Sequence, residues 1–215
     1  MSVDMSKSIL VFSYFTNMPG VCQAEWIDDR LWPFIDKGYD ISLISGTCCF
    51  THAHPKIKHS KVPALSPHGA AFEYNEIHRK NILAKKSLSY VYTKLMAYVE
   101  RVLEKLHIRS GDGRWTWFIT STIAGLTISS IKNVSFIYTT GGPASAHLSG
   151  IFFSKLFGKK VICEFEDPLS GKDIGRNSLS RIGLKFFEKR IIKYADCTIY
   201  CTKNAMLDAR RKYAQ

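Results

Sequence analysis

The sequence has no long hydrophobic run, and this absence limits where the chain can reside. No stretch approaches the roughly 20 uncharged apolar residues that a membrane-spanning helix needs. Residues 1–7 are polar, and the apolar run behind them ends at Asn17 without the small-residue cleavage signature of a secretory signal. We therefore expect a cytoplasmic protein, either soluble or attached peripherally to the inner face of a membrane.

Paired metal-binding and disulfide motifs are also missing. The six cysteines include no C-x-x-C pair, and three of them lie in apolar strand-like runs, which favours free thiols. His52 and His54 form an H-x-H pair, but no acidic or cysteine pair follows at metal-ligand spacing, so a solvated loop is the better interpretation. We therefore expect no metal site.

Motifs for nucleotide and nucleic-acid binding are absent as well. The chain has no G-x-G-x-x-G segment and no P-loop, because G-K-[ST] does not occur at the required spacing. Its aromatic residues are not interleaved with Arg and Gly, and no helix-turn-helix or zinc-finger pattern is present. These absences argue against a nucleic-acid partner.

Positive charge, in contrast, is abundant. Thirty Lys and Arg residues against eighteen Asp and Glu give a formal net charge of +12. Such an excess implies an anionic partner, which can be nucleic acid, an anionic membrane surface or a phosphorylated substrate. The length of 215 residues suits one well-cored domain.

Strand-like and helix-like segments alternate along the chain. Strands are expected at residues 9–14, 40–45, 134–139, 160–165 and 197–201, with a possible short edge strand at 62–65. Helices are expected at residues 21–36, 75–107, 115–131, 144–157 and 179–194, followed by a short final helix. This order predicts an α/β fold with a Rossmann-like parallel sheet flanked by helices.

The helix expected over residues 75–107 is amphipathic and basic. Its apolar stripe consists of Leu88, Val91, Leu95, Val99, Val102 and Leu106. Its basic residues, off this stripe, are Lys86, Lys94, Arg101 and Lys105. One interpretation is a surface helix packed on the sheet, and the other is contact with anionic lipid.

A sheet of this kind places its ligand crevice beyond the carboxyl ends of the strands, where the loops 14–20, 140–147 and 166–172 lie. In the second loop, Gly141 and Gly142 open a helix whose first N–H groups can hold a phosphate or a sugar hydroxyl. A tight turn that uses glycine for backbone reasons is the alternative. His147, in the first turns of this helix, can orient a substrate hydroxyl or be purely structural.

The third loop carries the acidic candidates. Glu164, Glu166 and Asp167 cluster at a strand end, and Asp167 is the one expected to face the crevice as a general base or hydroxyl acceptor. Asp before Pro is also a common turn former. The nearby cations Lys172, Arg176 and Arg181 can pair with a diphosphate or with the acidic loop itself.

Taken in order, these motifs resemble the N-terminal, acceptor-side domain of GT-B glycosyltransferases of family 4. The stretches that carry the likeness are residues 111–117, 134–148, 158–168 and 194–202. They match the family's D-x-x-x-x-W helix, its sxPP.ssH loop, its D-F-R-D-P strand end and its ADxxixxS strand. In two places the chain departs from the pattern: Glu166 replaces the Arg, and only Gly20 stands where the family usually has two adjacent glycines.

The resemblance implies a metal-independent, retaining transfer of a sugar from a nucleotide-sugar to a saccharide or lipid-linked hydroxyl acceptor, in cell-surface polysaccharide or glycolipid synthesis. It implies catalytic roles for Asp167 and His147. It implies substrate contacts for Pro19, Gly20, Gly141, Gly142, Ser145, Glu166 and Lys172. The nucleotide-sugar, a substrate rather than a cofactor, would bind mainly a C-terminal domain with an E-x7-E motif, so residues 1–215 alone are expected to be inactive. The alternative is a non-catalytic module that binds an anionic ligand or partner.

Overall fold

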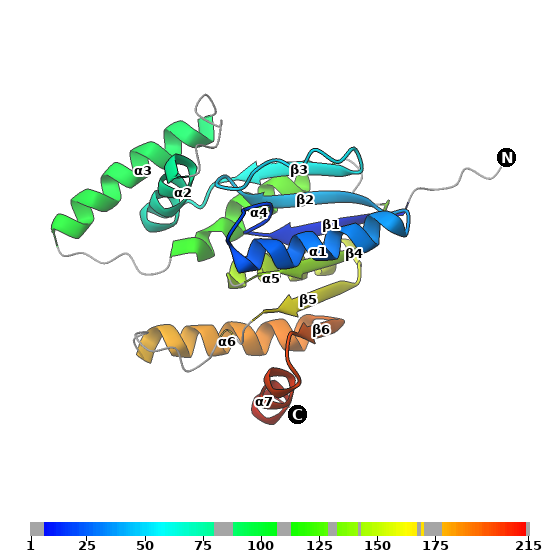
Figure 1. Ribbon diagram of the computed structural model, residues 1–215. Helices are drawn as coiled ribbons and strands as arrows, with labels where there is room; N and C mark the ends of the chain where they lie inside the picture. The colour runs from blue at the N-terminus through cyan, green and yellow to red at the C-terminus, as the bar shows by residue number, and fades with distance from the viewer. Residues whose placement is uncertain are drawn as a thin grey trace.

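One parallel sheet organises the part of the chain that the computed structural model describes, namely residues 7–79, 88–106, 113–128, 133–141, 143–166, 169 and 178–213. Its strands lie in the order β3-β2-β1-β4-β5-β6 (Figure 1). They are β1 (Ser8–Ser13), β2 (Asp40–Gly46), β3 (Ile57–Val62), β4 (Val134–Thr140), β5 (Val161–Phe165) and β6 (Cys197–Tyr200). All neighbouring strands pair in parallel, which confirms the predicted Rossmann-like α/β fold.

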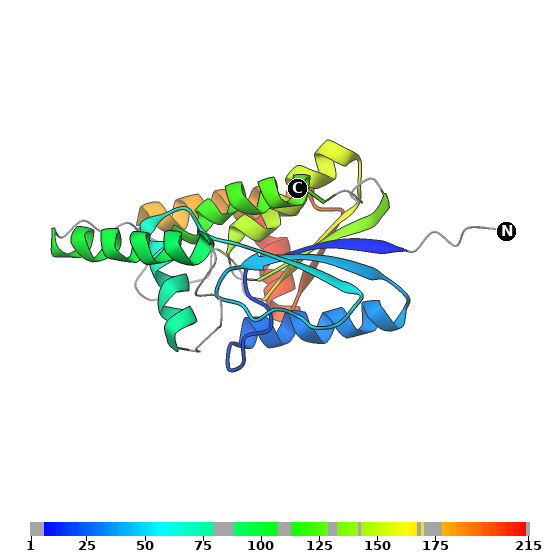
Figure 2. The same cartoon turned by 90° about the horizontal axis from the view of Figure 1, so that it is seen from above.

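Helices cover both faces of this sheet. They are α1 (Cys22–Asp36), α2 (Pro67–Arg79), α3 (Leu88–Lys105), α4 (Trp117–Leu126), α5 (Ala144–Phe157), α6 (Ser178–Tyr194) and α7 (Lys203–Tyr213), with a 3-10 turn η1 (Gly113–Thr116) before α4. Figure 2 shows α1 on one face and α4 and α5 on the other. None of the described helices is long and apolar enough to cross a membrane.

The central strand β1 explains how the two core layers arise. Its residues are buried throughout, because a strand covered by helices on both faces needs apolar side chains on both. Ile9 and Val11 pack with Leu31 of α1. Leu10 and Phe12 point the other way, into the core that includes Trp117 of α4 and Phe153 of α5. Alternation along one strand therefore supplies both layers.

The structure corrects two expectations between residues 47 and 107. The edge strand is β3, over Ile57–Val62, rather than residues 62–65. The single helix expected over residues 75–107 is two helices, α2 and α3, and α2 already begins at Pro67. Proline is favoured at the first position of a helix, where its missing N–H costs nothing.

Packing of the apolar stripe on the sheet was the wrong interpretation of α3. Leu88 and Leu95 of that stripe are exposed. The buried residues of α3 include Thr93 and Ala97, and its most extensive contacts are with α2. The packing face of this helix therefore combines small and polar residues with Tyr90, which contacts Tyr74 of α2. Most of the apolar stripe faces away, although Val99 is half-buried.

The structure also shows the environments of the paired histidines and the cysteines. His52 is not solvated, because its Nε2 lies 2.8 Å from Thr16 Oγ1 and its side chain is largely buried. His54 is exposed. All six cysteines are free thiols.

Candidate functional site

Two of the three predicted loops meet where the direction of strand order reverses. From β1 the chain continues to β2 and β3 on one side, and from β4 to β5 and β6 on the other. A sheet of this topology leaves a ligand crevice at that switch point, outside the carboxyl ends of its strands. A Cβ added to Gly141, just after β4, would lie 3.9 Å from Ser13 Oγ at the end of β1. The loop 140–147 therefore adjoins the loop 14–20, and Glu166 follows the next strand, β5.

The loop after β1 is held by a carboxylate of α1. Asp28 accepts a hydrogen bond from the Thr16 hydroxyl at 2.8 Å and bonds from the Asn17 N–H at 2.9 and 3.2 Å. Asn17 has a φ of 45°, in the left-handed region that Asn tolerates better than most residues. These bonds satisfy one backbone N–H, that of Asn17, and tie the loop to α1.

Pro19 and Gly20 lie exposed at the tip of this loop. Gly20 has a φ of 75° and open space where a Cβ would be, so glycine is required there by conformation rather than by close approach of a neighbour. Its N–H donates to Glu25 at 3.2 Å. A carboxylate thus already occupies the donor that a phosphate would use, and the substrate contact predicted for Gly20 cannot employ this N–H as the loop stands.

The second loop contains three buried polar groups without a hydrogen-bond partner among the residues that the structure describes. Thr140 Oγ1, Ser145 Oγ and His147 Nε2 form no hydrogen bond within the described residues, and all three side chains are completely buried. Gly141, between them, has a φ of 111°. The predicted residues Ser145 and His147 thus share one segment with Thr140, which was not predicted. Gly142 lies outside the described residues.

The proton on His147 can be assigned from its neighbours. Its Nδ1 lies 2.8 Å from Thr139 Oγ1, and the Thr139 hydroxyl donates to the carbonyl oxygen of Ile162 at 3.3 Å. When the Thr139 hydroxyl donates to Ile162 it accepts from Nδ1–H, and the lone pair of the neutral ring then lies at Nε2. Burial lowers the pKa of His147 to about 4, and the neutral ring packs on Phe165 with centroids 4.6 Å apart. In this tautomer His147 Nε2 is a buried hydrogen-bond acceptor.

The acidic residues at the end of β5 have different surroundings. Glu164 is 1% exposed and accepts from Arg30 Nη2 at 3.0 Å and Nε at 3.2 Å, and from the Tyr138 hydroxyl. It fixes α1 to the sheet, away from the crevice, and it helps to raise the pKa of Tyr138, although burial contributes more. Glu166 is half-buried just beyond the strand. The other predicted residues of this loop, Asp167, Lys172, Arg176 and the side chain of Arg181, lie outside the described part.

One buried carboxyl beneath the first loop escaped the sequence analysis. Glu73 of α2 accepts from the Tyr14 hydroxyl at 2.8 Å, from the Ala64 N–H at 3.1 Å and from the Thr47 hydroxyl. Burial raises the pKa of Glu73 to about 7, although these hydrogen bonds oppose the shift. No local pattern reveals this group, because its partners come from three separate segments, those that follow β1, β2 and β3.

The fold is that of a Rossmann-like α/β domain, with the switch point at the carboxyl ends of β1 and β4. No protein-family model and no curated protein matches the chain. Among solved structures, a short-chain dehydrogenase/reductase from Serratia marcescens is similar, with a TM-score of 0.31 and 12% identity over 91% of this chain and 95% of that one. A likeness this weak carries no argument about activity.

Proposed function

We propose that this chain is the acceptor-binding half of a retaining GT-B glycosyltransferase of the family-4 kind. The complete enzyme would transfer a sugar from a nucleotide-sugar to a saccharide or lipid-linked hydroxyl acceptor in cell-surface polysaccharide or glycolipid synthesis. The observation that carries the proposal is the set of buried, unpartnered groups of Thr140, Ser145 and His147 beside the switch point. Buried polar groups without partners are rare in proteins, and a ligand is one reason for them.

The chemistry of these groups favours a neutral polyhydroxyl ligand. His147 is uncharged and offers only a lone pair at Nε2, so it requires a donor such as a sugar hydroxyl. The Thr140 and Ser145 hydroxyls can each donate or accept. The resemblance adds Asp167 as the catalytic carboxylate. In this assignment His147 orients the acceptor hydroxyl, while Thr140 and Ser145 bind its neighbours.

The loop after β1 supports a division of labour between two halves. Dinucleotide-binding Rossmann domains hold a pyrophosphate at the N-terminus of the helix after their first strand. In this chain the Gly20 N–H is engaged by Glu25, and Asp28 lies one turn further along α1. Two carboxylates at this place repel a diphosphate. We therefore assign the nucleotide-sugar to another domain and expect this one to be inactive alone.

The second candidate function is a non-catalytic module for an anionic ligand. The exposed cations Lys94, Arg101 and Lys105 of α3 favour it. The two functions differ in which surface binds. A sugar acceptor would contact the loop 140–147, whereas an anionic partner would contact α3.

Ligand-observed NMR on the chain with three kinds of ligand tests the proposal. We expect saturation transfer to alkyl glycosides, and weak or no transfer to nucleotide-sugars or NADPH. Replacing Ser145 by Ala should reduce transfer to glycosides. Ser149→Ala is the matched control, because the Ser149 hydroxyl lies on the same helix but is already paired with Ser121 Oγ at 2.8 Å. Tight binding of a nucleotide-sugar or of NADPH to this chain would overturn the proposal.

A further inference from the structure

Helix α3 exposes a row of large apolar side chains to solvent. Among the side chains of α3 that the structure describes, the buried ones are Thr93, Ala97 and Glu100. The residues exposed on the opposite side, here called the outward face, are Leu88, Val91, Leu95, Tyr98, Val102 and Leu106. Their exposure ranges from 39% for Val102 to 86% for Leu88. An ordinary surface helix has the reverse arrangement, with its apolar stripe toward the core.

The spacing of these residues makes the outward face continuous. With 3.6 residues per turn, apolar residues that recur at alternating steps of three and four stay on one side of a helix. Lys94, Arg101 and Lys105 follow each other along one edge of this stripe and are exposed. Glu100 is buried and pairs with His68 at 3.1 Å. Among the described side chains, the exposed charges of α3 are therefore all positive.

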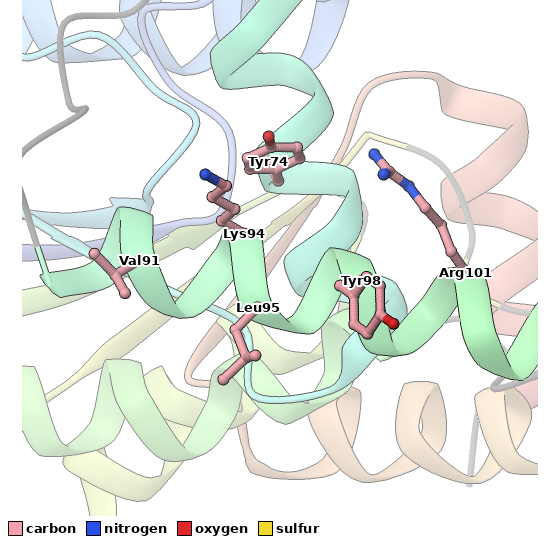
Figure 3. Close-up of a pocket in the computed structure, with 6 residues that line it drawn as sticks. All are labelled: Tyr74, Val91, Lys94, Leu95, Tyr98 and Arg101. Carbon is pink, nitrogen blue, oxygen red and sulfur yellow. The ribbon is translucent and has the colours of Figure 1, made fainter.

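A groove runs along the boundary between the basic edge and the apolar stripe. It has a volume of about 390 Å³ and is lined by Tyr74, Val91, Lys94, Leu95, Tyr98 and Arg101 (Figure 3). Figure 3 shows Lys94 and Arg101 extending on the same side as Tyr74 of α2, with Leu95 and Tyr98 on the other. Two cations beside an apolar strip match an anionic headgroup attached to an acyl chain.

We infer that the outward face of α3 docks on an anionic phospholipid bilayer. The apolar stripe enters the boundary between headgroups and acyl chains, while Lys94, Arg101 and Lys105 contact lipid phosphates. Helices with an apolar face and basic residues beside it lie in the membrane plane in this way. Docking through α3 deepens the proposed function, because a lipid-linked acceptor is presented at such a surface. Only this biological use of the docking rests on the proposed function.

The position of α3 agrees with that use. Figures 1 and 2 both show α3 projecting past the sheet on the side to which the carboxyl ends of the strands point. The candidate site lies at these same strand ends. Docking through α3 therefore brings the crevice near the membrane surface.

A second copy of the chain is a poorer occupant of this face. A two-fold dimer through α3 would bring Lys94, Arg101 and Lys105 of each copy near the same residues of the other. Like charges so close would oppose association. An anionic bilayer neutralises these cations instead, and the net charge of +12 adds a long-range attraction.

Vesicle co-sedimentation of the full 215-residue chain tests the inference. We expect binding to vesicles of phosphatidylcholine mixed with phosphatidylglycerol, little binding to phosphatidylcholine alone, and weakening at high salt. The double variant K94E/R101E should lower partitioning at least about tenfold, because each basic residue near an anionic surface contributes about fivefold. L95S/V102S should also lower it, although it leaves the charge unchanged.

Two matched control variants distinguish the outward face of α3 from the effects of net charge and of exposed apolar surface elsewhere on the molecule. R210E/R211E on α7 makes the same charge change at exposed positions elsewhere, and it should lower partitioning by no more than about threefold. I123S/L126S removes exposed apolar residues of α4 and should leave binding unchanged. Equal losses in K94E/R101E and R210E/R211E, loss in I123S/L126S alone, or no binding to anionic vesicles would each overturn the inference.

The outcomes also separate this inference from the proposed function. Vesicle binding without glycoside binding contradicts the proposed function and leaves the docking face standing. Glycoside binding without vesicle binding does the reverse. Concentration-dependent dimers in sedimentation velocity that K94E/R101E strengthens would assign the face to a second copy of the chain and overturn the docking inference.

Discussion

Gly141 joins β4 to the loop that opens α5, and its φ of 111° lies where side chains with a Cβ are strained. We expect Gly141→Ala to lower the free energy of unfolding by about 1–3 kcal/mol. Urea unfolding followed by circular dichroism measures this change. Gly183→Ala in α6 is the control of opposite sign, because a Cβ there meets nothing within 4 Å and Ala favours a helix over Gly by about 1 kcal/mol. Equal effects of the two substitutions would show that the backbone of Gly141 is not the cause.

His147 offers a test that separates its two nitrogens. Asn at this position can replace Nδ1 toward Thr139 but has no atom at Nε2, whereas Gln can reach the Nε2 position with its amide. We expect His147→Asn to lose glycoside binding at least about tenfold, as for a hydrogen bond worth about 1.5 kcal/mol, and His147→Gln to retain part of it. Calorimetric titration with an alkyl glycoside provides the measurement. Equal affinities in the two variants would remove His147 Nε2 from the site.

At the scale of residues, the site residues that could be predicted are those that lie close together in the sequence. Gly141, Ser145 and His147 stand within one short motif, so their proximity in space follows from their proximity in sequence. Glu73 was missed because it meets Tyr14 across 59 positions, and nothing local marks that contact. Glu164 was grouped with Glu166 by position, but Arg30 of α1 holds it elsewhere.

At the scale of elements, α5 depends on a glycine for its approach to the sheet. A Cβ on Gly150 would lie 2.1 Å from Thr139 Cγ2, and 3.3 Å from Val161 Cγ2. We expect Gly150→Ala to destabilise the fold by about 1–3 kcal/mol through overpacking and to weaken glycoside binding, because Thr139 holds His147. Thermal unfolding and the glycoside titration report the two effects. Ser154→Ala on the same helix should change neither, and stability unaffected by Gly150→Ala would contradict the close packing.

The elements that sequence predicted well are those with strong local signals. Strand β4 and helix α5 lie between clear glycine and proline boundaries, and their bounds agree with the prediction to within a residue. The failure was α3, because the expectation that an apolar stripe faces inward does not hold there. Its contact with α2 uses the pair of Glu100 with His68 and the packing of Tyr90 on Tyr74. These residues lie off the apolar stripe from which the helix was predicted, so the stripe did not indicate the packing face.

At the scale of the whole molecule, parallel pairing was predictable but the order of strands was not. Alternating strands and helices require crossover connections, and these require parallel strands. The placement of β4 beside β1 depends on contacts between residues more than a hundred positions apart. That placement creates the switch point, so the exact neighbours of the site emerge only from the folded chain.

Stability should depend on pH through Glu73. Its pKa, raised by burial to about 7, exceeds the unfolded value, so its stabilising contribution is full below about pH 4.5 and is lost as pH rises through 7. His59 and His147, with pKa values lowered by burial to about 3 and about 4, act oppositely. Their contribution is present above about pH 6.5 and is lost as pH falls through the lowered values.

The variant E73Q isolates the carboxyl from the histidines. Between about pH 4.5 and 7, the free energy of unfolding of the natural chain should fall relative to E73Q by about 3 kcal/mol. Urea unfolding at a series of pH values measures the difference, in which both histidines cancel. A constant difference across this range would show that Glu73 is ionised throughout.

His147 is assigned as a buried, neutral acceptor for a sugar hydroxyl, and the nitrogen resonances of its ring test this assignment directly. Long-range nitrogen–proton correlation spectra should show Nδ1 protonated, Nε2 unprotonated, and no titration between about pH 5 and 8, since burial lowers its pKa to about 4. Adding an alkyl glycoside should shift Nε2 in the direction of a new hydrogen bond. A ring that titrates near its ordinary pKa, or an Nε2 resonance that responds to NADPH or a nucleotide-sugar but not to the glycoside, would contradict the account.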